Sequence, residues 1–319
     1  MLDRTGRNIT YMRISITSAC NLRCRYCSPE DSSSGRDILT EDDIRRIAEA
    51  AVRLGVTHFR ITGGEPLVSP ILRDVIRTLK SIPGVSSVTL TTNGVMLEDR
   101  IPMLKESGID GINVSLDTLD SKEFIELTGR DALESVLSGI RASVKAGIPT
   151  KINTVIRENT HAEALVSWAS REGADIRFIE MMPIGYGRQY KNVSCDEIRE
   201  TLERSFGEFT ETFSGMAYEN GPARYFRQEN LAVRVGFISP IHGCFCSSCN
   251  RVRLTSDGIL KPCLCYHSEI NLKNMLDEGI NDAELTKIIE DAILSKPEQH
   301  DFGSIGSITE KKNMVSIGG

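Results

Sequence analysis

The chain has 319 residues, 40% of them hydrophobic and 26% charged, which are the proportions of an ordinary globular protein with one large or two smaller domains. The formal net charge of −6 argues against a nucleic-acid binder, and no apolar run reaches the roughly 18–20 residues of a membrane span. The first residues contain no apolar signal-peptide core, so a cytoplasmic protein without nucleic-acid or membrane partners is expected. Six of the nine cysteines lie in two tight clusters, which favours metal ligation over disulfides.

Short β-rich runs alternate with helical patterns from residue 11 to about residue 182. The first run, at 11–17, is followed by a cysteine-rich loop and then by a helix, for which Thr40 is the expected N-cap, Asp43 falls three residues later, and Gly55 marks the end. Five further strands are expected, at 57–63, 87–94, 112–117, 150–156 and 176–182. The repeated order of strand then helix predicts parallel strands with right-handed crossovers, in a barrel or an open sheet.

The least ordinary segments of this region follow the predicted strands directly. The cysteine loop follows the first strand, and "TGGEP", "TTNG", "SLD" and "MMP" follow the second, third, fourth and sixth. Because the carboxyl ends of parallel strands share one edge of an α/β fold, these segments are expected to converge on a single rim that carries the chemistry.

The pattern changes after about residue 218, which predicts a core region at 1–218 and a distinct region at 219–319. Two strands joined by a turn at Glu229–Asn230 are expected within 223–239, and helical stretches between residues 270 and 294. The residues from 302 onward predict no regular element. Because no low-complexity linker separates the two regions, they are expected to pack closely.

The first cysteine cluster is a triad with the spacing C-x3-C-x2-C, made by Cys20, Cys24 and Cys27. Three thiolates can hold three corners of a [4Fe–4S] cube and leave the fourth iron open for a ligand. A zinc site with a distant fourth ligand and an incidental grouping are the alternatives, and the position directly after a strand favours the cluster.

The second cluster contains a triad with the spacing C-x2-C-x13-C, made by Cys246, Cys249 and Cys263. Half of a zinc ribbon has the same spacing, so zinc and iron–sulfur are equally supported by this triad alone. Cys244 and Cys265 lie close by and are possible further zinc ligands, whereas Cys195 has no predicted role.

The first triad resembles the signature of the radical S-adenosylmethionine (radical SAM) superfamily, in which an aromatic residue precedes the third cysteine, as Tyr26 does here. The family's glycine-rich motif is similar to "TGGEP" at 62–66. The resemblance implies an α/β fold of the incomplete (β/α)6 barrel type, with SAM chelated by the open iron and cleaved reductively to a 5′-deoxyadenosyl radical. The residues it implies as SAM contacts are Tyr26, Gly64, Glu65, Ser115 and Met182.

The segment "FCSSCNRVRLTSDGILKPCL" resembles the C-terminal cluster segment of the GTP 3′,8-cyclase (MoaA-type) family, which begins molybdenum cofactor biosynthesis. "RITGGEPL", "NVSLDTLD", "FIEMMPIG" and the final "IGG" match as well, whereas Cys244 and Cys265 depart from the family pattern. The resemblance implies a C-terminal region with a second [4Fe–4S] cluster, whose open iron holds guanine. It also implies abstraction of hydrogen from C3′ of GTP and closure to (8S)-3′,8-cyclo-7,8-dihydro-GTP.

A triphosphate requires cations that stay charged when partly desolvated, and arginine meets this requirement because its planar fork binds phosphate through two hydrogen bonds. The resemblance implies as GTP contacts Arg13, Arg60, Thr91, Lys151, Arg251, Val252 and Arg253. It implies catalytic roles for Arg13, Arg251, Arg253, Gly318 and Gly319.

The C-terminal tail is expected to enter the GTP site, with Ile317 as its apolar anchor. Partners implied besides GTP and SAM are an electron donor and the pathway enzyme that takes the product onward; a homodimer is left open. A peptide-modifying radical SAM enzyme and a zinc-binding nucleotide sensor are the alternative functions.

Overall fold

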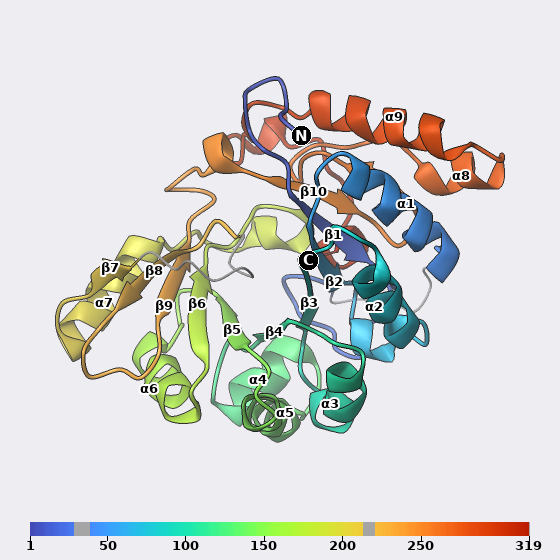
Figure 1. Ribbon diagram of the computed structural model, residues 1–319. Helices are drawn as coiled ribbons and strands as arrows, with labels where there is room; N and C mark the ends of the chain where they lie inside the picture. The colour runs from blue at the N-terminus through green and yellow to red at the C-terminus, as the bar shows by residue number, and fades with distance from the viewer. Residues whose placement is uncertain (29–38, 213–220, 319) are drawn as a thin grey trace.

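The computed structural model describes residues 1–28, 39–212 and 221–318, and it confirms the predicted α/β fold (Figure 1). All six expected strands are present and pair in chain order as parallel neighbours. They are β1 (Tyr11–Ser15), β2 (His58–Thr62), β3 (Ser87–Thr92), β4 (Gly111–Ser115), β5 (Thr150–Val155) and β6 (Asp175–Ile179).

Helices connect these strands and cover the outer face of the curled sheet (Figure 1). They are α1 (Glu41–Arg53), α2 (Leu72–Ser81), α3 (Leu97–Glu106), α4 (Ser121–Thr128), α5 (Leu133–Lys145) and α6 (Ala162–Glu172). The predicted start of α1 is confirmed, because the Thr40 and Asp43 side chains form a reciprocal capping box. Gly55 follows the end of α1 with a φ of 91°, a left-handed conformation that glycine adopts without steric cost.

The C-terminal part of the chain extends the same sheet at both edges. β10 (Arg251–Leu254) pairs in parallel with β1, and β9 (Val235–Ile238) pairs in parallel with β6. β8 (Arg224–Arg227), β7 (Thr210–Thr212) and β11 (Leu260–Lys261) add antiparallel partners beyond them. Within the described ranges β1 and β6 therefore have outer neighbours other than each other, and the eleven-stranded sheet is open.

The predicted boundary at 218/219 falls outside the described residues, and the division into two regions stays a prediction. The expected pair of strands within 223–239 is present as β8 and β9. The expected helices are α8 (Leu272–Asp277) and α9 (Asp282–Leu294), and α9 packs against α1. A further helix, α7 (Cys195–Phe206), precedes β7.

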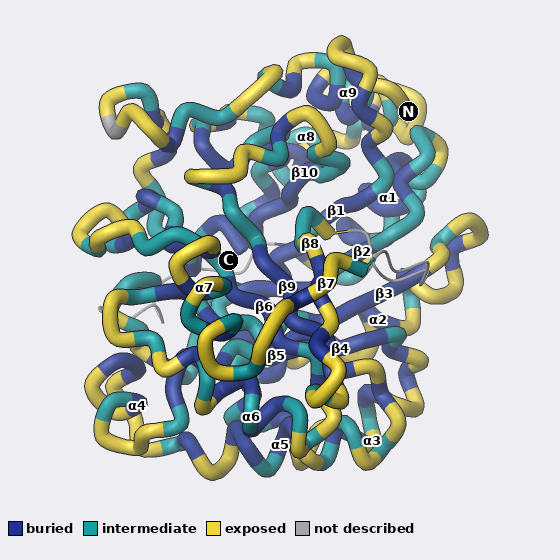
Figure 2. The backbone as a smooth tube through the Cα atoms, turned by 90° about the vertical axis from the view of Figure 1, so that its left-hand side faces the viewer, coloured by how far each residue is buried: buried dark blue, intermediate teal, exposed yellow. Residues whose placement is uncertain are grey.

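The two faces of the sheet differ in polarity because successive side chains of a strand point to opposite sides. Apolar residues such as Met12 and Phe59 are fully buried in the large core that the strands and outer helices share. Their strand neighbours Arg13 and Arg60 belong to the other set, which lines the interior of the curled sheet. In Figure 2 most of the trace of the central strands β1 to β6 is coloured as buried, whereas β7 and the ends of β8 are exposed.

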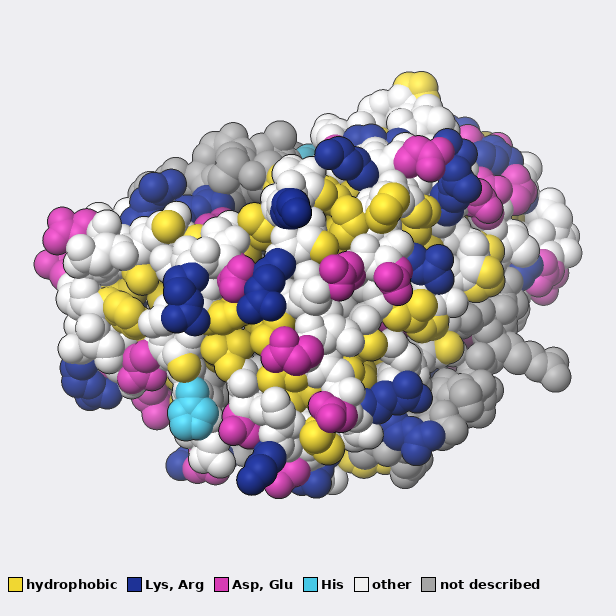
Figure 3. Space-filling model, turned by 90° about the horizontal axis from the view of Figure 1, so that it is seen from below, with side chains coloured by type: hydrophobic (Ala, Val, Ile, Leu, Met, Phe, Trp, Pro, Cys, Tyr) yellow, Lys and Arg dark blue, Asp and Glu magenta, His cyan; other side chains and the backbone are white. Residues whose placement is uncertain are grey.

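The outside of the molecule carries charges of both signs. On the face drawn in Figure 3, basic and acidic side chains are intermingled among scattered apolar ones. None of the helices in the described ranges combines the length and the apolar character that crossing a membrane requires.

Candidate active site

A single cavity of about 310 Å³ lies where the carboxyl ends of the strands meet the C-terminal segments. Its volume falls in the range of small-molecule sites. All six cysteines of the two predicted triads line it: Cys20, Cys24, Cys27, Cys246, Cys249 and Cys263. The fold thus brings together two ligand sets that lie far apart in the sequence.

The loop that carries the first triad is held by hydrogen bonds to neighbouring strand ends. Tyr26 donates its hydroxyl to Oδ2 of Asp117 at 2.6 Å, and Oδ1 of Asp117 accepts from the backbone N–H of Val155 at 2.8 Å. Burial raises the pKa of all three triad thiols, that of Cys27 to about 12, so metal binding there must displace protons. The buried soft donor set therefore fits an iron–sulfur cluster.

The glycine motif after β2 packs directly against the cysteine loop. A Cβ on Gly64 would lie 2.6 Å from the carbonyl oxygen of Ser18 and clash with that of Ala19, so only glycine fits. The Gly64 N–H donates to the carbonyl of Thr17 at 2.7 Å. Gly64 also lines the cavity, as do the other implied SAM contacts Tyr26, Ser115 and Met182.

Glu65, the fifth implied SAM contact, is buried behind the cavity wall and joins the ends of β2 and β3. Its carboxylate accepts from Thr92 Oγ1 at 2.6 Å and from the backbone N–H groups of Asn93 and Leu67 at 2.6 and 2.9 Å. Burial raises the pKa of Glu65 to about 7 against the opposing effect of these donors. The described geometry gives Glu65 a structural role at the rim, and its contact with SAM stays a prediction.

The two segments of the second triad are fixed by a buried arginine and a buried lysine. Arg7 pairs with Asp3 at 2.6 Å and donates to the carbonyl of Cys246 at 3.1 Å. Lys296 Nζ donates to the carbonyl of Arg251, two residues after Cys249, at 2.9 Å. It also donates to the carbonyl of Pro262, which directly precedes Cys263, at 2.6 Å. Neither cation was singled out from the sequence, because each acts through backbone groups that no motif encodes.

Cys249 lies beside positive charge. Burial would raise the pKa of its thiol, but the charges of Arg251 and Lys296 outweigh burial and lower that pKa to about 7. A thiolate is the form that binds metal, so the position favours ligation.

Four predicted arginines meet across neighbouring strands. Arg253, Arg13 and Arg60 are Cα partners in register across β10, β1 and β2, and Arg251 lies two residues before Arg253. All four line the cavity. Burial and the charge of Arg253 lower the pKa of Arg13, while burial and the charge of Arg251 lower the pKa of Arg253 to about 10. Such mutual repulsion inside a cavity favours binding of a polyanion.

Buried polar atoms without a hydrogen-bond partner among the described residues line the cavity. Oγ1 of Thr91 and Nε of Arg251 are both buried without a hydrogen bond from or to any described residue. Because buried polar groups nearly always have a partner, these atoms indicate where a polar ligand binds.

Two of the implied GTP contacts, Val252 and Lys151, do not line the cavity. Val252 is fully buried in the core, with Cα partners in β1, and does not line the cavity. Lys151 lies in β5 with its Nζ 5.2 Å from the ring centroid of Tyr225. The predicted roles of Val252 and Lys151 toward GTP thus have no direct geometric support.

The C-terminal tail packs into the site from a small second core that includes Ile317 (0% exposed). Met314 and Val315 of η6 (Met314–Ile317) line the cavity, and the carbonyl of Gly318 accepts a hydrogen bond from Arg253 Nη1 at 3.2 Å. Gly318 lies beside Ser15 and Thr62, at the ends of β1 and β2. Gly319 lies outside the described residues.

Several polar cavity residues were missed from the sequence. They are Asn93, Asn153, Arg177, Glu180, Lys296 and His300. Arg177 alternates with buried apolar residues in β6, as the predicted arginines do in their strands, and it donates to Asn113 and to Asn153 Oδ1. That alternation was a usable signal for Arg177, whereas the loop residue His300 offered none.

The comparisons with known proteins agree with this site. The radical SAM superfamily model matches residues 14–168, and the model described as Molybdenum Cofactor Synthesis C matches residues 174–302. The crystal structure of Streptococcus suis SuiB bound to S-adenosylmethionine aligns with a TM-score of 0.64 at 16% identity, covering 97% of this chain and 78% of that one. The SuiB structure with its precursor peptide SuiA gives a TM-score of 0.63 at the same identity, with coverage of 98% and 77%.

The sheet, the cysteine loop and the matched model define a radical SAM enzyme, a class that uses a [4Fe–4S] cluster and SAM. Closer relatives narrow the assignment. GTP 3′,8-cyclases of Clostridium perfringens (strain SM101) and Moorella thermoacetica are 39% and 40% identical over 326 and 330 residues, covering 100% of each chain. The chain belongs to the GTP 3′,8-cyclase family, and the family resemblance read from its motifs is confirmed.

Proposed function

We propose that the chain converts GTP to (8S)-3′,8-cyclo-7,8-dihydroguanosine 5′-triphosphate, the first step of molybdenum cofactor biosynthesis. One observation carries the proposal: both cysteine triads and four arginines line the same cavity. Family membership supports the reaction, and the cavity supplies a place for each of its participants.

The first triad holds a [4Fe–4S] cluster, and the second triad holds another. When bound, the first cluster and SAM supply the radical that removes a hydrogen atom from C3′ of the ribose. The chain positions these groups. Gly64 lets the rim pack directly against the cysteine loop, and Asp117 holds the hydroxyl of Tyr26, the residue that precedes Cys27.

GTP lies between the triads in this proposal, with its triphosphate on the arginines. Arg13, Arg60, Arg251 and Arg253 provide charge on three adjacent strands. Thr91 offers a buried hydroxyl without a described partner, which suits a hydrogen bond to the substrate. Lys151 and Val252 would act from behind these residues, by charge and by packing.

The tail completes the pocket. Gly318, whose carbonyl accepts from Arg253, restricts the space beside the substrate, and Arg251 and Arg253 orient the triphosphate during closure of the ring. The catalytic role expected of Gly319 belongs to the same proposal. An external one-electron donor and an enzyme that consumes the cyclised nucleotide are the required partners, and a reducing cytoplasm suits the free thiols.

The test is anaerobic reconstitution followed by product analysis with SAM and GTP deuterated at C3′. We expect cyclised product together with deuterium in 5′-deoxyadenosine. Deuterium-free 5′-deoxyadenosine without cyclised product would contradict the proposal.

Iron content tests the second cluster separately. The full chain is expected to bind about eight irons, and a variant with all three first-triad cysteines replaced by serine about four. Zinc in place of iron would favour the nucleotide sensor. Loss of all iron in the variant would contradict the assignment of a second cluster to Cys246, Cys249 and Cys263.

A further inference from the structure

A fully buried ion pair joins the C-terminal tail, residues 308–318, to β11. Lys261, the last residue of β11, is 2% exposed, and Glu310 in the tail is 1% exposed. Lys261 Nζ donates to one carboxylate oxygen of Glu310 and, at 2.6 Å, to the carbonyl of Tyr266. The other carboxylate oxygen accepts from the backbone N–H of Lys312 at 2.7 Å. Both buried charges therefore have the partners that such a pair requires.

Glu310 also ties the tail to the segment that follows β6. Its carbonyl accepts from Arg188 Nη2 at 3.0 Å, and Arg188 belongs to η3 (Gly185–Gln189). A Cβ on Gly185 would lie 3.0 Å from the Cα of Asn313, so the tail passes closely over this turn. The tail at Glu310 thus connects the segment after β6 with the strands that extend the sheet beyond β1.

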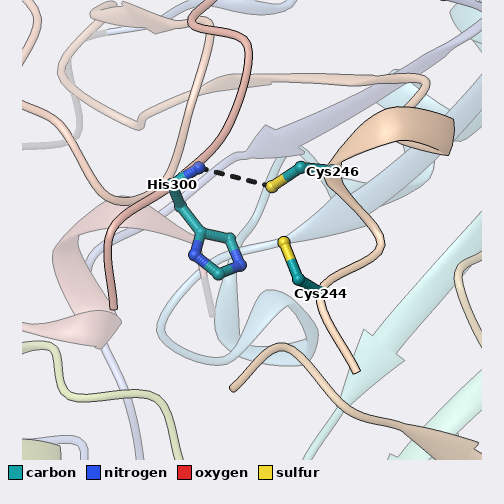
Figure 4. A group of neighbouring side chains, drawn as sticks. All are labelled: Cys244, Cys246 and His300. Atoms are coloured by element: carbon teal, nitrogen blue, oxygen red, sulfur yellow. Dashed lines mark hydrogen bonds between the residues drawn. The ribbon is translucent and has the colours of Figure 1, made fainter. Parts of the chain in front are cut away.

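The segment that leads into the tail is fixed beside the second triad. The His300 N–H donates to Cys246 Sγ at 3.3 Å (Figure 4). The ring of His300 packs on Phe302 with centroids 4.2 Å apart, and Phe302 belongs to the small second core with Ile308 and Ile317. The residues before the tail thus have anchors of their own, which do not involve Glu310.

The far end of the tail is held by the strand that pairs with β11. Arg253 of β10 and Lys261 of β11 are Cα partners, and partners across antiparallel strands lie on the same side of the sheet. Arg253 Nη1 donates to the Gly318 carbonyl at 3.2 Å. Two paired strand residues thus hold the tail at both ends, at Glu310 and at Gly318. Arg253 lines the cavity and Lys261 does not, so the ion pair is a fixed point outside the proposed substrate site.

We propose that Lys261 and Glu310 are positioning residues for the cyclisation. Their ion pair seats the tail so that the Gly318 carbonyl meets Arg253 in the cavity, and the role rests on the proposed function. Neither residue lines the cavity, so both act through the tail. A buried pair suits this task, because its separation leaves a charge buried without its counterion and makes release of the tail costly.

Hydrogen exchange of the tail amides measures seating directly and needs no turnover. The amides followed are those of residues 314–318, where Val315 is buried and the Ser316 N–H donates to the Asn313 carbonyl at 3.0 Å. Glu310→Gln keeps the shape of the side chain and removes its charge. In the anaerobically reconstituted full chain it should speed exchange of these amides at least about tenfold, because the lysine then stays buried with neutral acceptors only. Glu310→Leu, which also removes the acceptor, should speed exchange further.

Lys312→Met is the matched control, because it breaks an exposed ion pair of the same tail. Lys312 Nζ lies 2.7 Å from Oδ2 of Asp257, and the two side chains are 34% and 36% exposed. Exposed pairs contribute little, so tail exchange should change less than about fivefold. Amides of β1 and α9, which lie outside the tail, should exchange at the same rate in all variants.

The same preparations are then assayed with SAM and GTP. Lys261→Met and Glu310→Gln should each lower the ratio of cyclised product to 5′-deoxyadenosine at least about fivefold. The ratio falls because a displaced tail leaves radical formation in place and disturbs the step on the substrate. Lys312→Met should keep the ratio of the unchanged chain.

Tail exchange in Glu310→Gln no faster than in Lys312→Met would overturn the proposal. Equal acceleration in the tail, β1 and α9 would overturn it too, because the ion pair would then support the fold as a whole. An unchanged chain that releases no cyclised product would contradict the proposed function, and the exchange rates would still decide whether the pair seats the tail.

Discussion

Replacing Gly318 with alanine tests whether the C-terminal tail shapes the site. The Gly318 backbone has a φ of 74°, a left-handed conformation that costs a residue with a side chain about 1–2 kcal/mol. The new Cβ would also lie 3.1 Å from Thr62 Cγ2 and 3.2 Å from Ser15 Cβ, at the ends of β2 and β1. Both effects disfavour the seated tail.

A cost of about 1–2 kcal/mol lowers the population of the seated tail roughly five- to thirtyfold when seating is marginal. Displacement also breaks the hydrogen bond from Arg253 to the Gly318 carbonyl, and a bond from a charged donor is worth about 1.5–3 kcal/mol. Cyclised product per chain should therefore fall about five- to thirtyfold. Iron content should change little, because none of the six triad cysteines belongs to the tail.

The assay is product formation by the anaerobically reconstituted enzyme, with iron and SAM cleavage measured on the same sample. Gly306→Ala is the matched control, because a Cβ at Gly306 meets no atom within 4 Å and its φ is not left-handed. Deleting Gly318 and Gly319 should reduce product further. Normal product formation by Gly318→Ala, or an equal loss in Gly306→Ala, would refute the role of the tail.

Three further predictions concern other parts of the site. Cys24→Ser should abolish reductive cleavage of SAM, whereas Cys249→Ser should spare part of it and lose cyclised product; normal cyclisation by Cys249→Ser would contradict the second-cluster assignment. Arg251→Ala should weaken GTP binding roughly ten- to hundredfold in a calorimetric titration, with the melting temperature little changed, because a charged hydrogen bond contributes about 1.5–3 kcal/mol. Tyr26→Phe removes the hydrogen bond to buried Asp117. It should lower iron retention and SAM cleavage at unchanged GTP affinity, and an unaltered cleavage rate would exclude a positioning role.

The parts of the fold that the sequence predicted are those encoded locally. The six parallel strands carry β-rich runs bounded by turns, and the start of α1 is written in its capping residues Thr40 and Asp43. β7 and β11 were not predicted from the sequence, because they have only three and two residues and are defined by their antiparallel partners. The pairing of β10 with β1 joins segments that lie far apart in the sequence, and no local pattern encodes such a contact.

The candidate active site likewise contains features that the sequence predicted and features that it did not. Cysteine spacing identified six residues that line one cavity, and the family resemblance identified the arginines. The Glu65 carboxylate accepts from Thr92 and from two backbone N–H groups, and the motif does not encode these partners. A motif fixes a position in the chain, whereas the direction of a side chain depends on packing around it.

Arg253 belongs to the group of cavity arginines and also donates to the Gly318 carbonyl, so the tail is linked to the proposed triphosphate site. Burial and neighbouring cations lower the pKa of Arg13 and of Arg253, so this group of like charges costs stability. The Gly318 carbonyl offers Arg253 only a partial negative charge. A triphosphate offers several full charges, and it stabilises the folded chain in proportion to its binding. Relief of this repulsion by an anion is thus a source of affinity, and the Gly318 carbonyl fixes the direction of Arg253 in the proposed site.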